Sequence, residues 1–170
     1  MRNIEIKARL LDRPALSQAL TKLGARRVAN FTQVDTYFVV PSGRLKLRQS
    51  PGDPDVLIFY RRDNRRGPKP SDYYLAAIGP EQKLGELLVA ALGARVVVRK
   101  QRELWRWHNV RVHLDEVEGL GAFMEFEAQV DTVNDEALCQ QRTHELMAAL
   151  GLAPSDLIAG SYADLLEANQ

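Results

Sequence analysis

Apolar and charged residues alternate along the start of the chain, and this pattern limits what the chain can fold into. In segment 4–10 the even-numbered residues are apolar, whereas Glu5, Lys7 and Arg9 lie between them. Successive side chains of an extended strand point to opposite faces, so this strand has one apolar and one charged face. Similar strand-like segments are 34–40, 44–49, 56–62, 96–105, 111–117 and 122–130. The sequence therefore predicts many strands, several of which are two-faced.

Leucines at helical spacing predict helices between these strands. The expected helices span about 14–23, 81–92 and 135–150, with a short fourth at 162–168. Each of the first three is followed by a glycine, Gly24, Gly93 or Gly151, which can adopt the left-handed conformation that ends a helix. Asp12 and Asn134 are the expected N-caps of the first and third. Short connections at 41–43 and 107–109 favour antiparallel neighbours, so we predict an α+β fold.

The tetrapeptide Leu-Gly-Ala-Arg occurs at 23–26 and again at 92–95, each time between helical and strand-like sequence. The match arises either by chance or because the chain contains two similar halves that face one another across a shared sheet. Segment 61–70 lies between them, is rich in arginine and proline, and has no hydrophobic pattern. We expect it to be a mobile, exposed loop.

The charged strand faces have two possible interpretations. They could form salt bridges on an exposed sheet. Alternatively, the sheet could curl with helices outside, so that the charges line its interior. Crowded cations in such an interior repel one another unless an anion joins them, and a triphosphate would supply it, while carboxylates would hold Mg²⁺ or Mn²⁺. The alternation alone does not choose between the two arrangements.

Composition excludes several classes of protein. The 23 basic and 22 acidic residues give a formal net charge of only +1, so no strong overall field favours nucleic acid or membrane. The single cysteine excludes an internal disulfide. No stretch of roughly 18 apolar residues occurs. We expect one cytoplasmic domain over residues 1–170, with no membrane or nucleic-acid partner and with a homodimer as an open possibility.

Several blocks in order resemble a known family. Asn-Ile-Glu-Ile-Lys at 3–7 is similar to the E-x-E-x-K signature of CYTH proteins, the triphosphate tunnel metalloenzyme superfamily. Further matching blocks are 33–38, 43–48, 98–102 and 113–121, followed by the acidic pair Glu125 and Glu127. Within the superfamily the chain is most similar to class IV adenylate cyclases. The resemblance implies an antiparallel, closed or nearly closed β-barrel, a tunnel with helices packed outside.

The resemblance also implies roles for individual residues. Metal ligands for Mg²⁺ or Mn²⁺ would be Glu5, Asp115, Glu125 and Glu127. Substrate-binding residues would be Lys7, Lys46, Arg48, Arg61, Lys100 and Arg102, of which Lys7, Lys100 and Arg102 would also act in catalysis. Asp35 and Tyr37 lie in a matching block without an assigned role. The first signature glutamate is replaced by Asn3, which removes one negative charge from the expected metal site.

Three functions remain open from the sequence. The leading one is the conversion of ATP to cyclic AMP and pyrophosphate by a metal-dependent enzyme. The second is a triphosphatase that hydrolyses inorganic triphosphate, thiamine triphosphate or a nucleoside triphosphate. The third is a polyphosphate- or nucleotide-binding module with weak catalysis, which Asn3 suggests. No phosphate-binding loop of the G-x-x-x-x-G-K-[ST] type occurs in the sequence.

Overall fold

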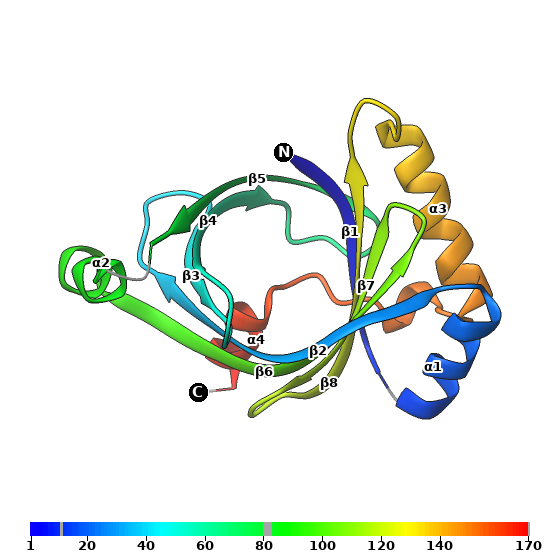
Figure 1. Ribbon diagram of the computed structural model, residues 1–170, viewed down its shortest axis with the longest axis horizontal. Helices are drawn as coiled ribbons and strands as arrows, with labels where there is room; N and C mark the ends of the chain where they lie inside the picture. The colour runs from blue at the N-terminus through cyan, green and yellow to red at the C-terminus, as the bar shows by residue number, and fades with distance from the viewer. Residues whose placement is uncertain (11, 80–82, 170) are drawn as a thin grey trace.

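The computed structural model describes residues 1–10, 12–79 and 83–169, and in this part of the chain eight antiparallel strands close into a ring (Figure 1). The strands are β1 (Arg2–Arg9), β2 (Arg26–Phe38), β3 (Arg44–Gln49), β4 (Asp55–Arg62), β5 (Lys69–Ile78), β6 (Ala94–Trp107), β7 (Val110–Val117) and β8 (Gly121–Val130). The helices are α1 (Arg13–Lys22), α2 (Leu84–Leu92), α3 (Glu136–Ala149) and α4 (Tyr162–Ala168), with a 3₁₀ turn at Pro154–Asp156. The order around the ring is β1-β5-β4-β3-β2-β6-β7-β8, which confirms the predicted antiparallel α+β ring.

The order of elements along the chain repeats. A strand, a helix and three further strands run from β1 to β4, and the same order runs from β5 to β8 with α2 as its helix. Two of the four equivalent pairs are neighbours in the ring, since β1 pairs with β5 and β2 pairs with β6. The two Leu-Gly-Ala-Arg segments follow α1 and α2, and Gly24 and Gly93 have positive φ angles of 78° and 76°. The element order therefore agrees with the interpretation as two similar halves.

Helices α1 and α3 cover the outer face of the ring beside β1, β7 and β8 (Figure 1). Leu20 of α1 and Leu146 of α3 pack there with Ile4, Val112 and Phe126, and all five side chains are at most 1% exposed. Burial of each such side chain stabilises the fold by about 1.5–3 kcal/mol. Because the apolar strand faces lie against these helices, the charged faces point into the ring.

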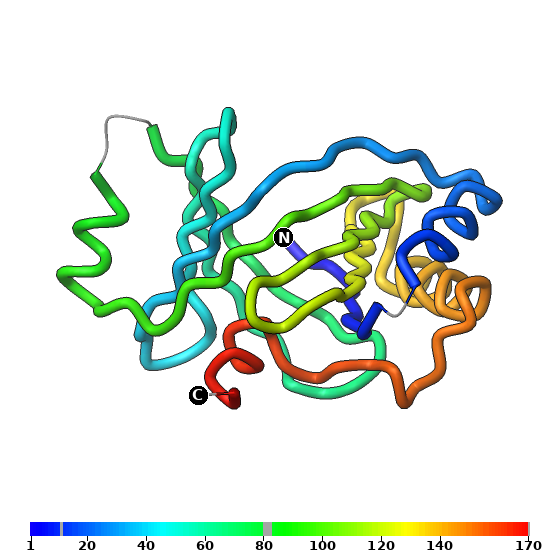
Figure 2. The backbone as a smooth tube through the Cα atoms, turned by 90° about the horizontal axis from the view of Figure 1, so that it is seen from below, coloured from blue at the N-terminus to red at the C-terminus, as the bar shows by residue number. Residues whose placement is uncertain are grey.

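The wall formed by β3, β4 and β5 lacks this cover. Helix α2 lies beside this wall (Figure 2), with Leu84 and Leu88 against a small cluster that contains Phe38 and Leu47. None of the described residues of α2 is buried. On β5 the outward side chain of Tyr74 is 71% exposed. Apart from this cluster, the outer face of this wall is therefore less covered than that of the opposite wall.

The structure corrects the prediction of a loop over residues 61–70. Strand β4 continues to Arg62 and β5 already begins at Lys69, so only residues 63–68 connect the two strands. Strand β5 was not predicted, because residues 69–78 show no alternation of apolar and polar side chains. The predicted start of the second helix at 81 lies outside the described residues, and the third helix is capped by Asp135 rather than Asn134.

The C-terminal segment returns across one end of the ring (Figure 1). Ile158 donates its backbone N–H to the carbonyl of Lys7 at 2.8 Å, and Ser161 caps α4. Arg44 of β3 holds the Asp164 carboxylate of α4 at 2.9 Å. The segment thus forms part of the wall of the interior. Among the described residues, no helix is long and apolar enough to cross a membrane.

Candidate functional site in the ring interior

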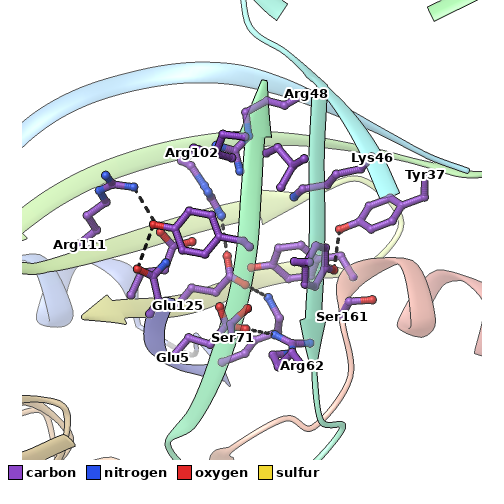
Figure 3. A pocket seen from close by; sticks show the side chains of 18 of the residues that line it. Glu5, Tyr37, Lys46, Arg48, Arg62, Ser71, Arg102, Arg111, Glu125 and Ser161 are labelled. Atoms are coloured by element: carbon purple, nitrogen blue, oxygen red, sulfur yellow. Dashed lines mark hydrogen bonds and ion pairs between the residues drawn. The ribbon is translucent and has the colours of Figure 1, made fainter. Parts of the chain in front are cut away.

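The ring encloses a cavity whose wall is dominated by charged and aromatic side chains (Figure 3). Its basic residues are Lys7, Lys46, Arg48, Arg62, Lys100, Arg102 and Arg111, and its carboxylates are Glu5, Glu125 and Glu127. The other polar residues of the lining are Asn3, Ser71, Ser161, Tyr37, Tyr60, Tyr73 and Tyr162. Seven cations face three carboxylates, so the lining has an excess of positive charge.

Three of the cations surround one buried carboxylate, that of Asp35, and we name Lys46, Arg48 and Lys100 the basic cluster. The ammonium groups of Lys46 and Lys100 lie 3.0 and 3.1 Å from Asp35 Oδ2, and Arg48 Nε lies 3.6 Å from Oδ1. Burial favours the neutral acid, but Lys100 and Lys46 outweigh it and hold the pKa of Asp35 far below its usual range. One carboxylate leaves this cluster positively charged, and Arg48 Nε is without a hydrogen-bond acceptor.

The carboxylates of β1 and β8 form the opposite part of the wall, and we name Glu5, Glu125 and Glu127 the acidic cluster. Strand register places Glu5 directly opposite Glu127. Burial, together with repulsion from Glu127 and Glu125, raises the pKa of Glu5 despite its ion pair with Arg62. This region therefore favours an additional positive charge.

Arg102, a further cation of the lining, is held by carboxylates in a fixed orientation. Arg102 donates Nε and Nη2 to the two oxygens of Asp115, at 2.7 and 2.5 Å, and its Nη2 also lies 2.6 Å from Glu125. Burial opposes ionisation of Asp115, but Arg102 and Lys100 hold its pKa at about 2. The hydroxyl of Tyr162 donates to the same carboxylate at 2.8 Å. The guanidinium fork of Arg102 is thus oriented before any ligand binds.

Lys7 lies between the acidic cluster and the C-terminal segment. Its ammonium pairs with Glu125 and lies 3.3 Å from the ring centroid of Tyr162, a cation–π contact. Burial lowers the pKa of Lys7 to about 8, although Glu125 counteracts part of this effect. The side chain remains mostly protonated at neutral pH and can contribute positive charge to the cavity.

Two carboxylates of the acidic cluster have the donor chemistry of a divalent-metal site. Within residues 1–10, 12–79 and 83–169, no three His, Cys, Asp or Glu side chains converge as a metal site. Mg²⁺ in phosphate-processing sites is commonly held by one or two carboxylates together with substrate phosphates. Glu5 and Glu127 match that pattern, because they lie directly opposite one another. The raised pKa of Glu5 indicates that an additional cation would be favourable there. Asn3 lies in the same lining and accepts a hydrogen bond from Tyr73 at 3.4 Å.

The structure brings most of the predicted site residues into one cavity and redirects two of them. Arg61 points away from the cavity, with its guanidinium carbon 5.4 Å from the Phe59 ring centroid, whereas its neighbour Arg62 lines the cavity. Asp115 is fully buried behind Arg102 and does not line the cavity, so we assign it to positioning that arginine rather than to holding metal. Arg62, rather than the predicted Arg61, therefore lies where a ligand in the cavity could reach it.

Sequence reasoning missed three other residues of this region. Asp35 organises the basic cluster, Tyr162 reaches the cavity from the C-terminal helix, and Lys69 is 1% exposed with no hydrogen-bond partner for its ammonium group. Burial and the nearby charge of Arg62 lower the pKa of Lys69 to about 8. Arg62 lies two residues after Tyr60 on β4, so both side chains point into the cavity. This shared parity was the signal in the sequence that could have identified Arg62.

Comparison with known proteins gives consistent results. The family model of the CYTH domain matches residues 1–162. A proposed adenylate cyclase of Methanocaldococcus jannaschii is 26% identical over 180 residues, which cover 97% of this chain and 98% of that protein. A protein of Pyrococcus horikoshii has a similar structure, with a TM-score of 0.82 at 22% identity over 96% of this chain and 98% of that one.

A more distant structural relative comes from Hippeastrum. It is a proposed adenylyl cyclase described as having a dominant triphosphatase activity. Its TM-score is 0.67 at 16% identity, over 99% of this chain and 96% of that one. At these identities the two solved structures establish a shared fold.

Proposed function

Because this chain belongs to the CYTH domain family, we propose that it is a divalent-metal-dependent enzyme that binds a triphosphate inside the ring and hydrolyses it. The observation that carries this proposal is the charge of the lining. The whole chain has a formal net charge of only +1, yet seven cations and three carboxylates line the cavity. Positive charge is thus concentrated where a linear polyanion would enter the ring.

The residues of the lining suit binding and charge stabilisation. The basic cluster and Arg62 would bind phosphate oxygens, and Arg102, oriented by Asp115, would bind them as a planar fork. In hydrolysis, water attacks the terminal phosphorus, the bond to the bridging oxygen breaks, and diphosphate leaves. Fixed cations such as Arg102 and Lys7 would stabilise the negative charge that develops on that oxygen. Mg²⁺ or Mn²⁺ held by Glu5 and Glu127 would neutralise phosphate charge and polarise the reacting group.

We place hydrolysis ahead of cyclisation because hydrolysis needs only the phosphate groups and water. The lining is charged or otherwise polar except for Ile58 and Leu75 and the rings of its tyrosines. The triphosphatase activity described for the Hippeastrum relative supports the same choice.

Cyclisation of ATP is the second candidate. The proposed adenylate cyclase from M. jannaschii supports it by name. Ile58 and Leu75 are directly opposed on β4 and β5 and both line the cavity, so they offer an apolar surface for a nucleoside. In that reaction the ribose 3′-hydroxyl attacks the α-phosphorus and pyrophosphate leaves.

The test is incubation of the purified protein with tripolyphosphate, ATP or thiamine triphosphate, each with Mg²⁺ or Mn²⁺, followed by separation of the products. Orthophosphate release supports hydrolysis, and cyclic AMP supports the cyclase. Arg102→Ala should lose triphosphate binding, whereas Arg99→Ala, an exposed change on the outer face of the same strand, should retain it. Binding without turnover of any substrate would leave a binding module, and no binding at all would refute the site.

A further inference from the structure

One row of side chains crosses six strands on the inner face of the ring. Strand register places its members directly opposite one another, in the order Arg26 (β2), Arg106 (β6), Arg111 (β7), Glu127 (β8), Glu5 (β1) and Lys69 (β5). Directly opposed residues of neighbouring strands project from the same face. Arg111, Glu127 and Glu5 line the cavity, so Arg26 and Arg106 lie on a continuation of the same surface.

The first three members are arginines on adjacent strands, and we name Arg26, Arg106 and Arg111 the arginine row. Arg26 and Arg106 are exposed, and no carboxylate of the described residues lies within ion-pair distance of either one. Arg111 has only a long contact to Glu127, at 3.7 Å. Like charges directly opposite one another destabilise a sheet. An anion that bridges the three guanidinium groups would remove that repulsion.

The neighbouring arginine on the other face shows the contrast. Arg27 follows Arg26 in the chain, and its guanidinium lies 3.3 Å from the carboxylate of Glu103. Glu103 and Arg106 have opposite parity on β6, so Glu103 belongs to the outer face. The outer arginine therefore has a partner within the chain, whereas the inner row has an unpaired surface that continues into the cavity.

Distance along the strand separates the arginine row from the basic cluster. Lys100, Arg102 and Arg106 have the same parity on β6, and Arg106 follows Lys100 by six positions. At the usual rise of a strand, their Cα atoms are roughly 20 Å apart. β2 and β6 are the two long strands that run along much of the molecule (Figure 2). A triphosphate held by Lys100 and Arg102 is much shorter than this path, whereas a longer chain would reach Arg106.

We propose that the arginine row is an outer subsite for linear polyphosphate of more than three phosphoryl groups, whose terminal groups occupy the cavity. The proposal rests on the proposed function, because it extends the same anion path. Guanidinium forks match the oxygens of successive phosphoryl groups. RNA with a 5′-triphosphate is the competing polyanion, but recognition of single-stranded RNA uses aromatic stacking platforms and the six-residue row contains no aromatic side chain.

The test compares ligands of different length. Dissociation constants for tripolyphosphate and for a polyphosphate of about 15 phosphoryl groups are measured by calorimetry at several salt concentrations, with the native protein and with the double variant Arg26→Gln/Arg106→Gln. We expect the native protein to bind the long chain at least tenfold more tightly. The double variant should lose that advantage while tripolyphosphate affinity changes less than twofold. Arg99→Gln is the matched control, an exposed arginine on the outer face of β6.

The outcomes separate this inference from the proposed function. Equal affinity of the native protein for both ligands, or an equal loss for both in the double variant, overturns the outer subsite while leaving the cavity assignment intact. A dependence on Arg26 and Arg106 seen with 5′-triphosphate RNA but not with polyphosphate overturns it in favour of nucleic acid. Failure of the native protein to bind even tripolyphosphate refutes the proposed function itself, and this inference with it.

Discussion

The basic and acidic clusters lie on the same inner surface but have opposite charge relations. In the basic cluster three cations share Asp35, which is 1% exposed and whose pKa is strongly lowered. In the acidic cluster Glu5 faces Glu127 and Glu125, and its pKa is raised. Buried ion pairs stabilise only when the charges are matched. The comparison teaches that Asp35 joins the three cations of the first cluster. In the second cluster burial opposes ionisation, but Lys7 and Arg102 lower the pKa of Glu125 and His113 lowers that of Glu127, so Glu5 alone is ionised against its surroundings.

The largest effect that would test this comparison is expected from Asp35→Asn. The substitution leaves Lys46, Lys100 and Arg48 without their shared carboxylate, and loss of one partner in a buried ion pair costs about 3–5 kcal/mol. We expect a destabilisation of about 3 kcal/mol in urea unfolding. Tripolyphosphate should stabilise the variant more than the native protein, since it can replace the missing anion. Asp53→Asn, at an exposed carboxylate, is the control.

The same substitution should alter the acid limb of stability. The folded-state pKa of Asp35 lies far below that of the unfolded chain, about 3.9. Its contribution is therefore complete above that value and declines as the pH falls below it. Between pH 6 and 2 the free energy of unfolding should decline less steeply in the variant than in the native protein. Identical slopes for the two proteins would contradict the role of Asp35.

The next largest effect is expected from Arg62→Gln, which tests the boundary between the clusters. Arg62 pairs with Glu5 inside the cavity, whereas its neighbour Arg61 points outward. Loss of a hydrogen bond to a charged group costs about 1.5–3 kcal/mol. Tripolyphosphate should bind Arg62→Gln about 10- to 100-fold more weakly, and Arg61→Gln within twofold of the native protein, by calorimetry. The reverse ranking would show that the inward parity of β4 is misassigned.

A smaller effect is expected from Glu5→Gln, which removes charge from the acidic cluster. Because the pKa of Glu5 is higher in the folded protein than in the unfolded chain, ionised Glu5 lowers the stability at neutral pH. This cost vanishes as the pH falls below the pKa that Glu5 has in the unfolded chain. The variant should therefore unfold at a higher temperature at pH 7 and at the same temperature near pH 4. It should also need about tenfold more Mg²⁺ for half-maximal turnover. A variant that is destabilised at pH 7 would contradict the proposed difference between the clusters.

The smallest effect is expected from Tyr162→Phe. This change removes the hydrogen bond from the tyrosine hydroxyl to Asp115, which retains both contacts with Arg102. A hydrogen bond to a charged group contributes about 1.5–3 kcal/mol to stability, but Asp115 still holds Arg102, so we expect tripolyphosphate affinity to fall only about fivefold. Tyr74→Phe, at an exposed tyrosine on the outer face of β5, should have no effect. Equal affinities of both variants would show that Arg102 needs no support from α4.

The sequence predicted the helix-covered part of the ring better than the uncovered part. On β1, β7 and β8 one face packs against helices and the other lines the cavity, so alternation identified the inward residues. Along β4 the run from Val56 to Tyr60 is apolar throughout, so its inward face could not be read, and Arg61 was chosen instead of Arg62. Asp35 and Tyr162 act through residues distant in sequence, such as Lys100 and Asp115. Those contacts follow from ring closure rather than from local pattern.

Closure of the ring joins the two ends of the polypeptide. Strand β1 pairs with β8, so Lys7 lies opposite Glu125, 118 residues later in the chain. Pairings between such distant segments form slowly, because a long loop must close before they contribute stability. The acidic cluster therefore cannot assemble on a growing or partly folded chain that lacks β8. The proposed metal and phosphate site would exist only in a molecule whose ring has closed, so ligand binding would itself report that folding is complete.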